Sequence, residues 1–157
     1  MTPTEIGSFQ YRGARAMVLL HEQHMREFLE TWRAFRASGL PMPETKDPDY
    51  ASPQLLLRHV LGAARSYMTW MCEKLGYPDP GIDPAPDVTE IEAKAGAYLE
   101  HVIKGWRAPL SGLSEERSSE EYKSRWGTVY CIDGMLEHAV MHPIRHTFQL
   151  KERLSGR

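Results

Sequence analysis

The sequence predicts an all-α protein built as a four-helix bundle. Four segments of roughly 20 residues each carry apolar side chains three and four positions apart, the spacing of one face of a helix. The connections between these segments are rich in proline, glycine and charged residues, and none of them alternates convincingly as a strand would. Helices with one apolar face bury that face most simply against one another, which favours a bundle.

Length and composition limit the possibilities further. The chain has 157 residues, a net charge of −2 and 25% charged residues, so residues 1–157 are expected to form one ordinary globular domain. Lysine and arginine are scattered along the chain, which argues against nucleic-acid binding. There is no signal peptide and no apolar run of about 20 residues, so we expect a cytoplasmic protein without a membrane partner. Cys72 and Cys131 fit no CxxC spacing and are expected to be reduced thiols in apolar surroundings.

The first helix is predicted from about Tyr11 to Ser38, where Gly39 and Pro41 end it. Its apolar stripe consists of Ala14, Val18, His21, Met25, Phe28, Trp32 and Phe35. Histidines on such a stripe are more often hydrogen-bonded core residues than ligands. We therefore expect His21 in the core, and the alternative is that it reaches a functional site.

The second helix is predicted from Ser52, as N-cap, and Pro53 to about Leu75. His59 is its only histidine and falls early on the apolar face. A stiff loop with four prolines, 78–86, follows. This loop either walls the mouth of a cavity or serves as a plain connection.

The third helix is predicted to open with a capping box at 87–90 and to end before Pro109. The next connection, of about 22 residues, is long enough to cross an end of the bundle, so simple up-down order is not guaranteed. It is expected to contain a helical turn at 118–123 and a short extended segment. The last helix should run from about Ile132 to Leu154.

Three histidines, His138, His142 and His146, recur every fourth residue in that last helix. Positions four apart lie on one helix face, so an HxxxH pair can aim two imidazoles at one point. His142 and His146 form such a pair, and His59 is the best third ligand from another helix. Three nitrogen ligands leave positions open for water or substrate, as in catalytic metal sites. Zinc, nickel, iron(II) and manganese all accept these ligands, and the alternative is a pair that merely faces solvent.

The order of these features resembles the DinB/YfiT-like superfamily. That family's last helix typically carries a pattern such as LLHxxxHExxHRGQ, and this chain reads MLEHAVMHPIRHTFQ over residues 135–149. The match makes His142 and His146 the two ligands of the last helix and His59, in LLLRHVLGAARSYMTWM, the ligand of the second helix. His138 matches a frequent histidine outside the ligand triad, so we expect it to support the site or to line its wall.

The resemblance implies a DinB-like bundle with a long crossover before the last helix, one divalent metal ion and a possible homodimer. It also implies a small-molecule substrate, with a low-molecular-weight thiol such as bacillithiol or mycothiol as cosubstrate of an S-transferase. Metal-dependent hydrolysis and a non-catalytic metal-binding or stress-related bundle are the alternatives. Tyr67 and Trp70 either line the pocket or pack in the core, and Gln149 either fixes an imidazole or bonds to the backbone.

The chain departs from the family pattern at three positions. Pro143 replaces the usual acidic residue, and Thr147 and Phe148 replace arginine and glycine. Proline cannot donate a backbone hydrogen bond to the carbonyl of Ala139, so we expect a kink in the helix at this point. The missing acid also removes a group that could handle protons or orient a ligand.

Overall fold

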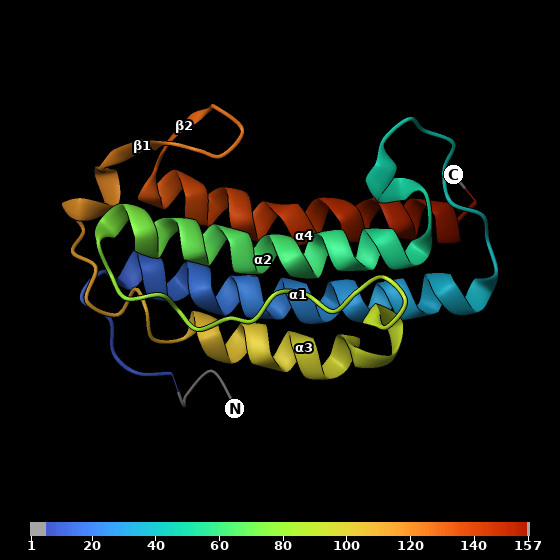
Figure 1. The fold of residues 1–157 in the computed structure, drawn as a ribbon, viewed down its shortest axis with the longest axis horizontal. Helices are drawn as coiled ribbons and strands as arrows, with labels where there is room; N and C mark the ends of the chain where they lie inside the picture. Colours follow the sequence, from blue (N-terminus) through green and yellow to red (C-terminus); the bar gives the residue numbers. More distant parts are fainter. Residues whose placement is uncertain (1–5, 157) are drawn as a thin grey trace.

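The protein, described here from a computed structural model, is mostly helical over residues 6–156, the part of the chain that the structure describes. Four helices lie side by side along the long axis of the molecule (Figure 1). The elements in chain order are α1 (Arg12–Ser38), η2 (Pro48–Tyr50), α2 (Pro53–Leu75), α3 (Ile91–Trp106), η3 (Arg117–Ser119), β1 (Glu121–Lys123), β2 (Val129–Cys131) and α4 (Ile132–Leu154). Within the described residues, no helix is long and apolar enough to cross a membrane.

The helices do not alternate simply in direction. Figure 1 shows α1 and α4 running one way and α2 and α3 running the other. The proline-rich segment after α2 therefore returns along the length of the bundle. The Arg65 side chain donates to the carbonyl of Ile82 at 2.7 Å, and Tyr98 donates to the carbonyl of Asp83 at 2.8 Å, so both neighbouring helices hold this segment. The connection between α3 and α4 stays at one end of the bundle (Figure 1).

Local sequence signals set most helix ends. The Ser52 hydroxyl accepts the N–H of Leu55, and Gly39 and Gly76 end α1 and α2 with φ of 69° and 72°, a left-handed conformation that favours glycine. The predicted capping box of the third helix is wrong. This helix begins at Ile91, where no side chain caps it.

The connection before α4 differs from the prediction in one respect. The expected helical turn is shorter, a single 3-10 turn at η3, and residues 121–123 form a strand instead. This strand pairs antiparallel with β2, which places Tyr122 opposite Tyr130. Strands of three residues are too short for a visible alternation of polar and apolar residues, which is why the sequence did not reveal this hairpin.

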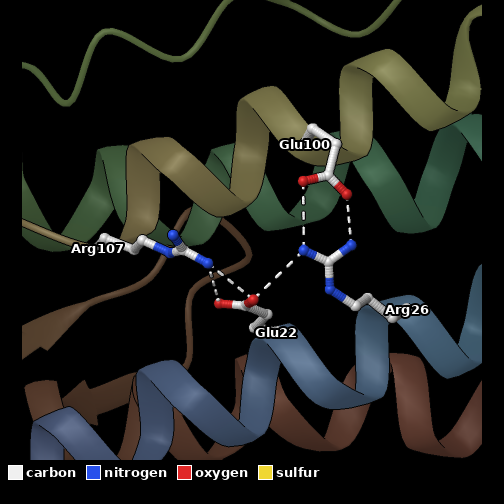
Figure 2. Close-up of polar contacts among 4 residues, drawn as sticks. All are labelled: Glu22, Arg26, Glu100 and Arg107. Carbon is white, nitrogen blue, oxygen red and sulfur yellow. Dashed lines mark hydrogen bonds and ion pairs between the residues drawn. The ribbon is translucent and has the colours of Figure 1, made fainter. Parts of the chain in front are cut away.

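The core is apolar, and one buried ion pair crosses between α1 and the end of α3. Arg107 donates to both carboxylate oxygens of Glu22, at 2.8 and 3.0 Å, and both side chains are buried. Figure 2 shows that this pair continues into an exposed ion pair between Arg26 and Glu100. Arg26 also donates to Glu22 at 3.3 Å.

His21 lies in this core, as predicted, but it is not hydrogen-bonded. Its ring stacks on Trp106 with centroids 3.6 Å apart, and neither ring nitrogen has a hydrogen-bond partner in the described part of the chain. Burial, with a smaller effect of His24, lowers the pKa of His21 to about 3. This histidine is therefore a neutral aromatic core residue.

Helix α4 passes through Pro143 without interruption. The Thr147 hydroxyl donates to the carbonyl of Pro143 at 2.7 Å. Pro143 itself is buried, and the helix continues for three further turns to Leu154.

Candidate metal site

Three histidines from two helices converge at one point of the bundle. His59 comes from α2, and His142 and His146 come from α4. One ring nitrogen of each lies within 4.8 Å of the other two. The Nε2 atoms of His59 and His142 are 3.0 Å apart. These three side chains are close enough together to hold one metal ion.

One distance in the cluster matches the ligand spacing of a transition-metal ion. Metal–nitrogen bonds of about 2.0–2.1 Å place two ligand nitrogens about 3.0 Å apart at a right angle and about 3.4 Å apart at a tetrahedral angle. The 3.0 Å between His59 and His142 matches this spacing. Two ligands on opposite sides of an ion are about 4.2 Å apart, which is less than the 4.8 Å within which the three nitrogens lie. The imidazoles would therefore have to rotate slightly to bind one ion together.

His146 offers the clearest sign of a missing partner. Its Nε2 atom is buried and has no hydrogen-bond partner among the described residues. A buried polar atom without a partner costs free energy. A metal ion at the centre of the cluster would satisfy this nitrogen.

The outer nitrogens of two histidines are held by other side chains. His59 Nδ1 lies 3.2 Å from a carboxylate oxygen of Asp49. His146 Nδ1 lies 2.7 Å from the hydroxyl of Tyr50 and 3.1 Å from the amide oxygen of Gln149, which also accepts from Tyr50. Acceptors at Nδ1 favour a proton there, and the Nε2 lone pair is then free to face a metal ion.

The surroundings keep two of the imidazoles uncharged. Burial, followed by the neighbouring His146 and His59, lowers the pKa of His142 to about 2. Burial, followed by His59, lowers the pKa of His146 to about 4. Neutral imidazole is the form that binds metal, so both residues are in the binding form at neutral pH.

The cluster borders a cavity of about 790 Å³. This volume falls within the usual range for small-molecule sites. The η2 segment and α4 supply most of the polar lining, including Asp49, Tyr50, Arg145 and Gln149. Tyr67, Trp126 and His138 form an aromatic side of the same cavity.

The remaining sequence predictions have mixed outcomes. His138 and Tyr67 line the cavity, with ring centroids 5.2 Å apart, and Gln149 contacts an imidazole. Trp70 does not line it but is buried in the core, and its Nε1 donates to the carbonyl of Lys123 at 3.2 Å.

The role of the proline-rich segment 78–86 was left open by the sequence. The proline-rich segment borders a smaller hollow of about 380 Å³ through Pro84 and Ala85, and Asp49 and His59 line this hollow too. No residue of the segment lines the 790 Å³ cavity. Neither cysteine lines the large cavity.

Sequence reasoning missed four contributors, which are Asp49, Tyr50, Trp126 and Arg145. The first two lie in the stretch MPETKDPDY, which resembled an ordinary polar connection. Asp47 accepts the backbone N–H of Asp49 and starts the η2 turn that brings both residues to the histidines. The Asp-Pro pair at 47–48 was a usable turn signal. Trp126 lies in the hairpin loop, which the sequence did not reveal.

A comparison with protein-family models, curated proteins and solved structures finds no match to this chain.

Proposed function

We propose that this protein is a metal-dependent enzyme in which His59, His142 and His146 hold one divalent ion beside a small-molecule cavity. The observation that carries the proposal is the convergence of three imidazoles from two helices on that cavity. Structural zinc sites are closed by four protein ligands. Three ligands facing a cavity leave a position for a reactant, which favours a catalytic role.

We further propose that the reaction transfers a small electrophile to a low-molecular-weight thiol. This step rests on the resemblance to DinB/YfiT-like proteins, and the size of the cavity supports it. A cavity of about 790 Å³ has room for an organic reactant beside the three histidines. A bound divalent ion acts as a Lewis acid that lowers the pKa of the thiol.

The residues of the chain have separate tasks in this reaction. Asp49, Tyr50 and Gln149 orient the imidazoles of His59 and His146. Tyr67, Trp126 and His138 shield one side of the cavity from water. The thiolate sulfur forms a bond to the electrophilic carbon, the leaving group departs with its electron pair, and the thiol proton passes to solvent.

Turnover with and without metal tests this proposal. The protein, purified without a histidine tag and loaded separately with Zn²⁺, Ni²⁺, Mn²⁺ or Fe²⁺, is incubated with a chlorodinitrobenzene acceptor and bacillithiol, mycothiol or glutathione. We expect conjugation that requires the metal and is lost in His59→Ala. His101→Ala is the matched control, because His101 lies outside the cluster and bonds to the Asp83 backbone.

The other outcomes separate the alternatives. Metal-dependent cleavage of aryl esters without a thiol would replace transfer by hydrolysis. Stoichiometric metal with neither reaction would support a non-catalytic metal-binding protein. Absence of metal binding would contradict the proposal as a whole.

A further inference from the structure

Arg145 is a cation of the cavity for which the fold supplies no partner. It lies on α4 next to His146 and lines the cavity. Within residues 6–156 it makes no hydrogen bond or ion pair, unlike Arg153 in the same lining, which donates to the carbonyl of Pro41 at 2.8 Å. Arg145 therefore has no evident role in holding the fold together.

The charge of Arg145 affects the pKa values of three ring side chains that line the cavity. After burial, Arg145 is the second cause that lowers the pKa of His138. Burial raises the pKa values of Tyr50 and Tyr67, and Arg145 is the largest effect that opposes this rise in both. These three rings come from η2, α2 and α4, and they line the same cavity as Arg145.

Three carboxylates, Asp47, Asp49 and Glu152, also line the cavity, but none of them forms an ion pair with Arg145 among the described residues. Asp49 is paired with His59, and Asp47 accepts the N–H of Asp49. A divalent ion at the histidines would add further positive charge to the same space. An anionic ligand would relieve this repulsion and could form a charge-assisted, bidentate pair with the guanidinium.

Part of the cavity lining is aromatic. Trp126, half exposed on the β1–β2 hairpin, lies 5.2 Å from the His138 ring and 6.4 Å from the Tyr67 ring. Tyr130 packs next to these rings, with its ring centroid 5.5 Å from that of Trp126 and 5.4 Å from that of His138. Such a surface binds a flat apolar group well.

We infer that the substrate held in this cavity is a small organic anion whose carboxylate or similar group pairs with Arg145 and whose flat apolar part packs on Tyr67, Trp126 and His138. This inference deepens the proposed function and rests on it, in that the ligand is taken to be a reactant of the metal site. It identifies Arg145 as a substrate-binding residue and predicts that an anionic substrate binds more tightly than its neutral analogue.

Calorimetric titration with 3-phenylpropionate and its uncharged amide tests the inference. Both compounds are titrated into metal-stripped and into zinc-loaded protein. We expect the acid to bind both forms of the wild type, and to bind Arg145→Gln at least about tenfold more weakly, the loss typical of one charge-assisted pair. The amide should bind wild type and Arg145→Gln equally weakly, and Trp126→Ala should weaken the binding of both compounds.

Matched variants make the result specific. Arg33→Gln removes an exposed arginine that lies on α1 outside the cavity, and it should bind the acid as the wild type does. Arg145→Lys should restore part of the affinity. Because Arg145 is exposed and makes no structural contact, the melting temperature of its variants should stay at the wild-type value.

Three results would overturn the inference. These are equal affinity of Arg145→Gln and wild type for the acid, equal affinity of wild type for acid and amide, and no binding of the acid at millimolar concentration. Titration of the metal-stripped protein separates this inference from the proposed function. If the protein fails to bind metal but binds the acid through Arg145, only the proposed function is contradicted. If it binds metal but not the acid, only the inference about Arg145 is contradicted.

Discussion

At the scale of single residues, the candidate site depends on the partners of the imidazoles as much as on the imidazoles themselves. Tyr50 is the best placed of these partners, because its hydroxyl bridges His146 Nδ1 and the amide oxygen of Gln149. With the proton on Nδ1, the imidazole donates a hydrogen bond to the Tyr50 hydroxyl, which in turn donates one to the amide oxygen of Gln149. This arrangement leaves the buried Nε2 of His146 as a lone pair that faces the other two histidines.

Replacing Tyr50 with phenylalanine should therefore weaken metal binding without removing a ligand. We expect the affinity for Zn²⁺ to fall about 10- to 100-fold, the usual effect of losing a hydrogen bond to a ligating histidine. Competition titration with a chromophoric chelator measures this change. Tyr77→Phe is the control, since Tyr77 lies outside the cavity, and it should bind Zn²⁺ as the wild type does. Equal affinity of Tyr50→Phe and wild type would show that Tyr50 does not orient His146.

At the scale of secondary-structure elements, α1 and α3 are joined by a charged contact as well as by apolar packing. Glu22 of α1 and Arg107, just after α3, are buried, and they meet through two hydrogen bonds (Figure 2). Most of the cost of burying such ions is offset only while both partners are present. The contact lies outside the cavity lining, so its effect on stability can be measured apart from metal binding.

The variant Glu22→Gln should consequently be strongly destabilised, because it leaves the Arg107 charge buried beside a neutral amide. We expect a loss of about 3–5 kcal/mol in the free energy of unfolding. Glu90→Gln is the comparison, because it breaks the exposed ion pair with Lys94 and should cost at most about 1 kcal/mol. Urea denaturation followed by circular dichroism measures both values. A loss below about 1 kcal/mol in Glu22→Gln would contradict this account of the α1–α3 contact.

At the scale of the whole molecule, the sequence predicted the helices well because their signals are local. The apolar stripe, the Ser52–Pro53 start and the Gly39 and Gly76 ends all act within a few residues. The β1–β2 hairpin could not be predicted in this way, because its strands have three residues each. The return of residues 78–86 along the bundle depends on contacts with two helices that are distant in sequence.

The candidate site, like the fold, was predictable where its residues lie in helices and not where they lie in connections. The spacing of His142 and His146 places them on one face of α4, and His59 stood out as the only histidine of its helix. Asp49, Tyr50 and Trp126 lie in connections, and their position depends on how those connections pack on the helices. The pairing of α2 with α4, which brings His59 to the other two histidines, is likewise a property of the assembled bundle.

Anomalous X-ray diffraction from crystals of the metal-loaded protein tests the central claim most directly, because it identifies the ion and its ligands together. Data collected on both sides of the metal absorption edge should give one peak per chain, about 2.0–2.2 Å from a ring nitrogen of each of His59, His142 and His146. The peak should disappear in His59→Ala crystals soaked in the same way. No peak at the three histidines, or a peak bound by other residues, would contradict the account.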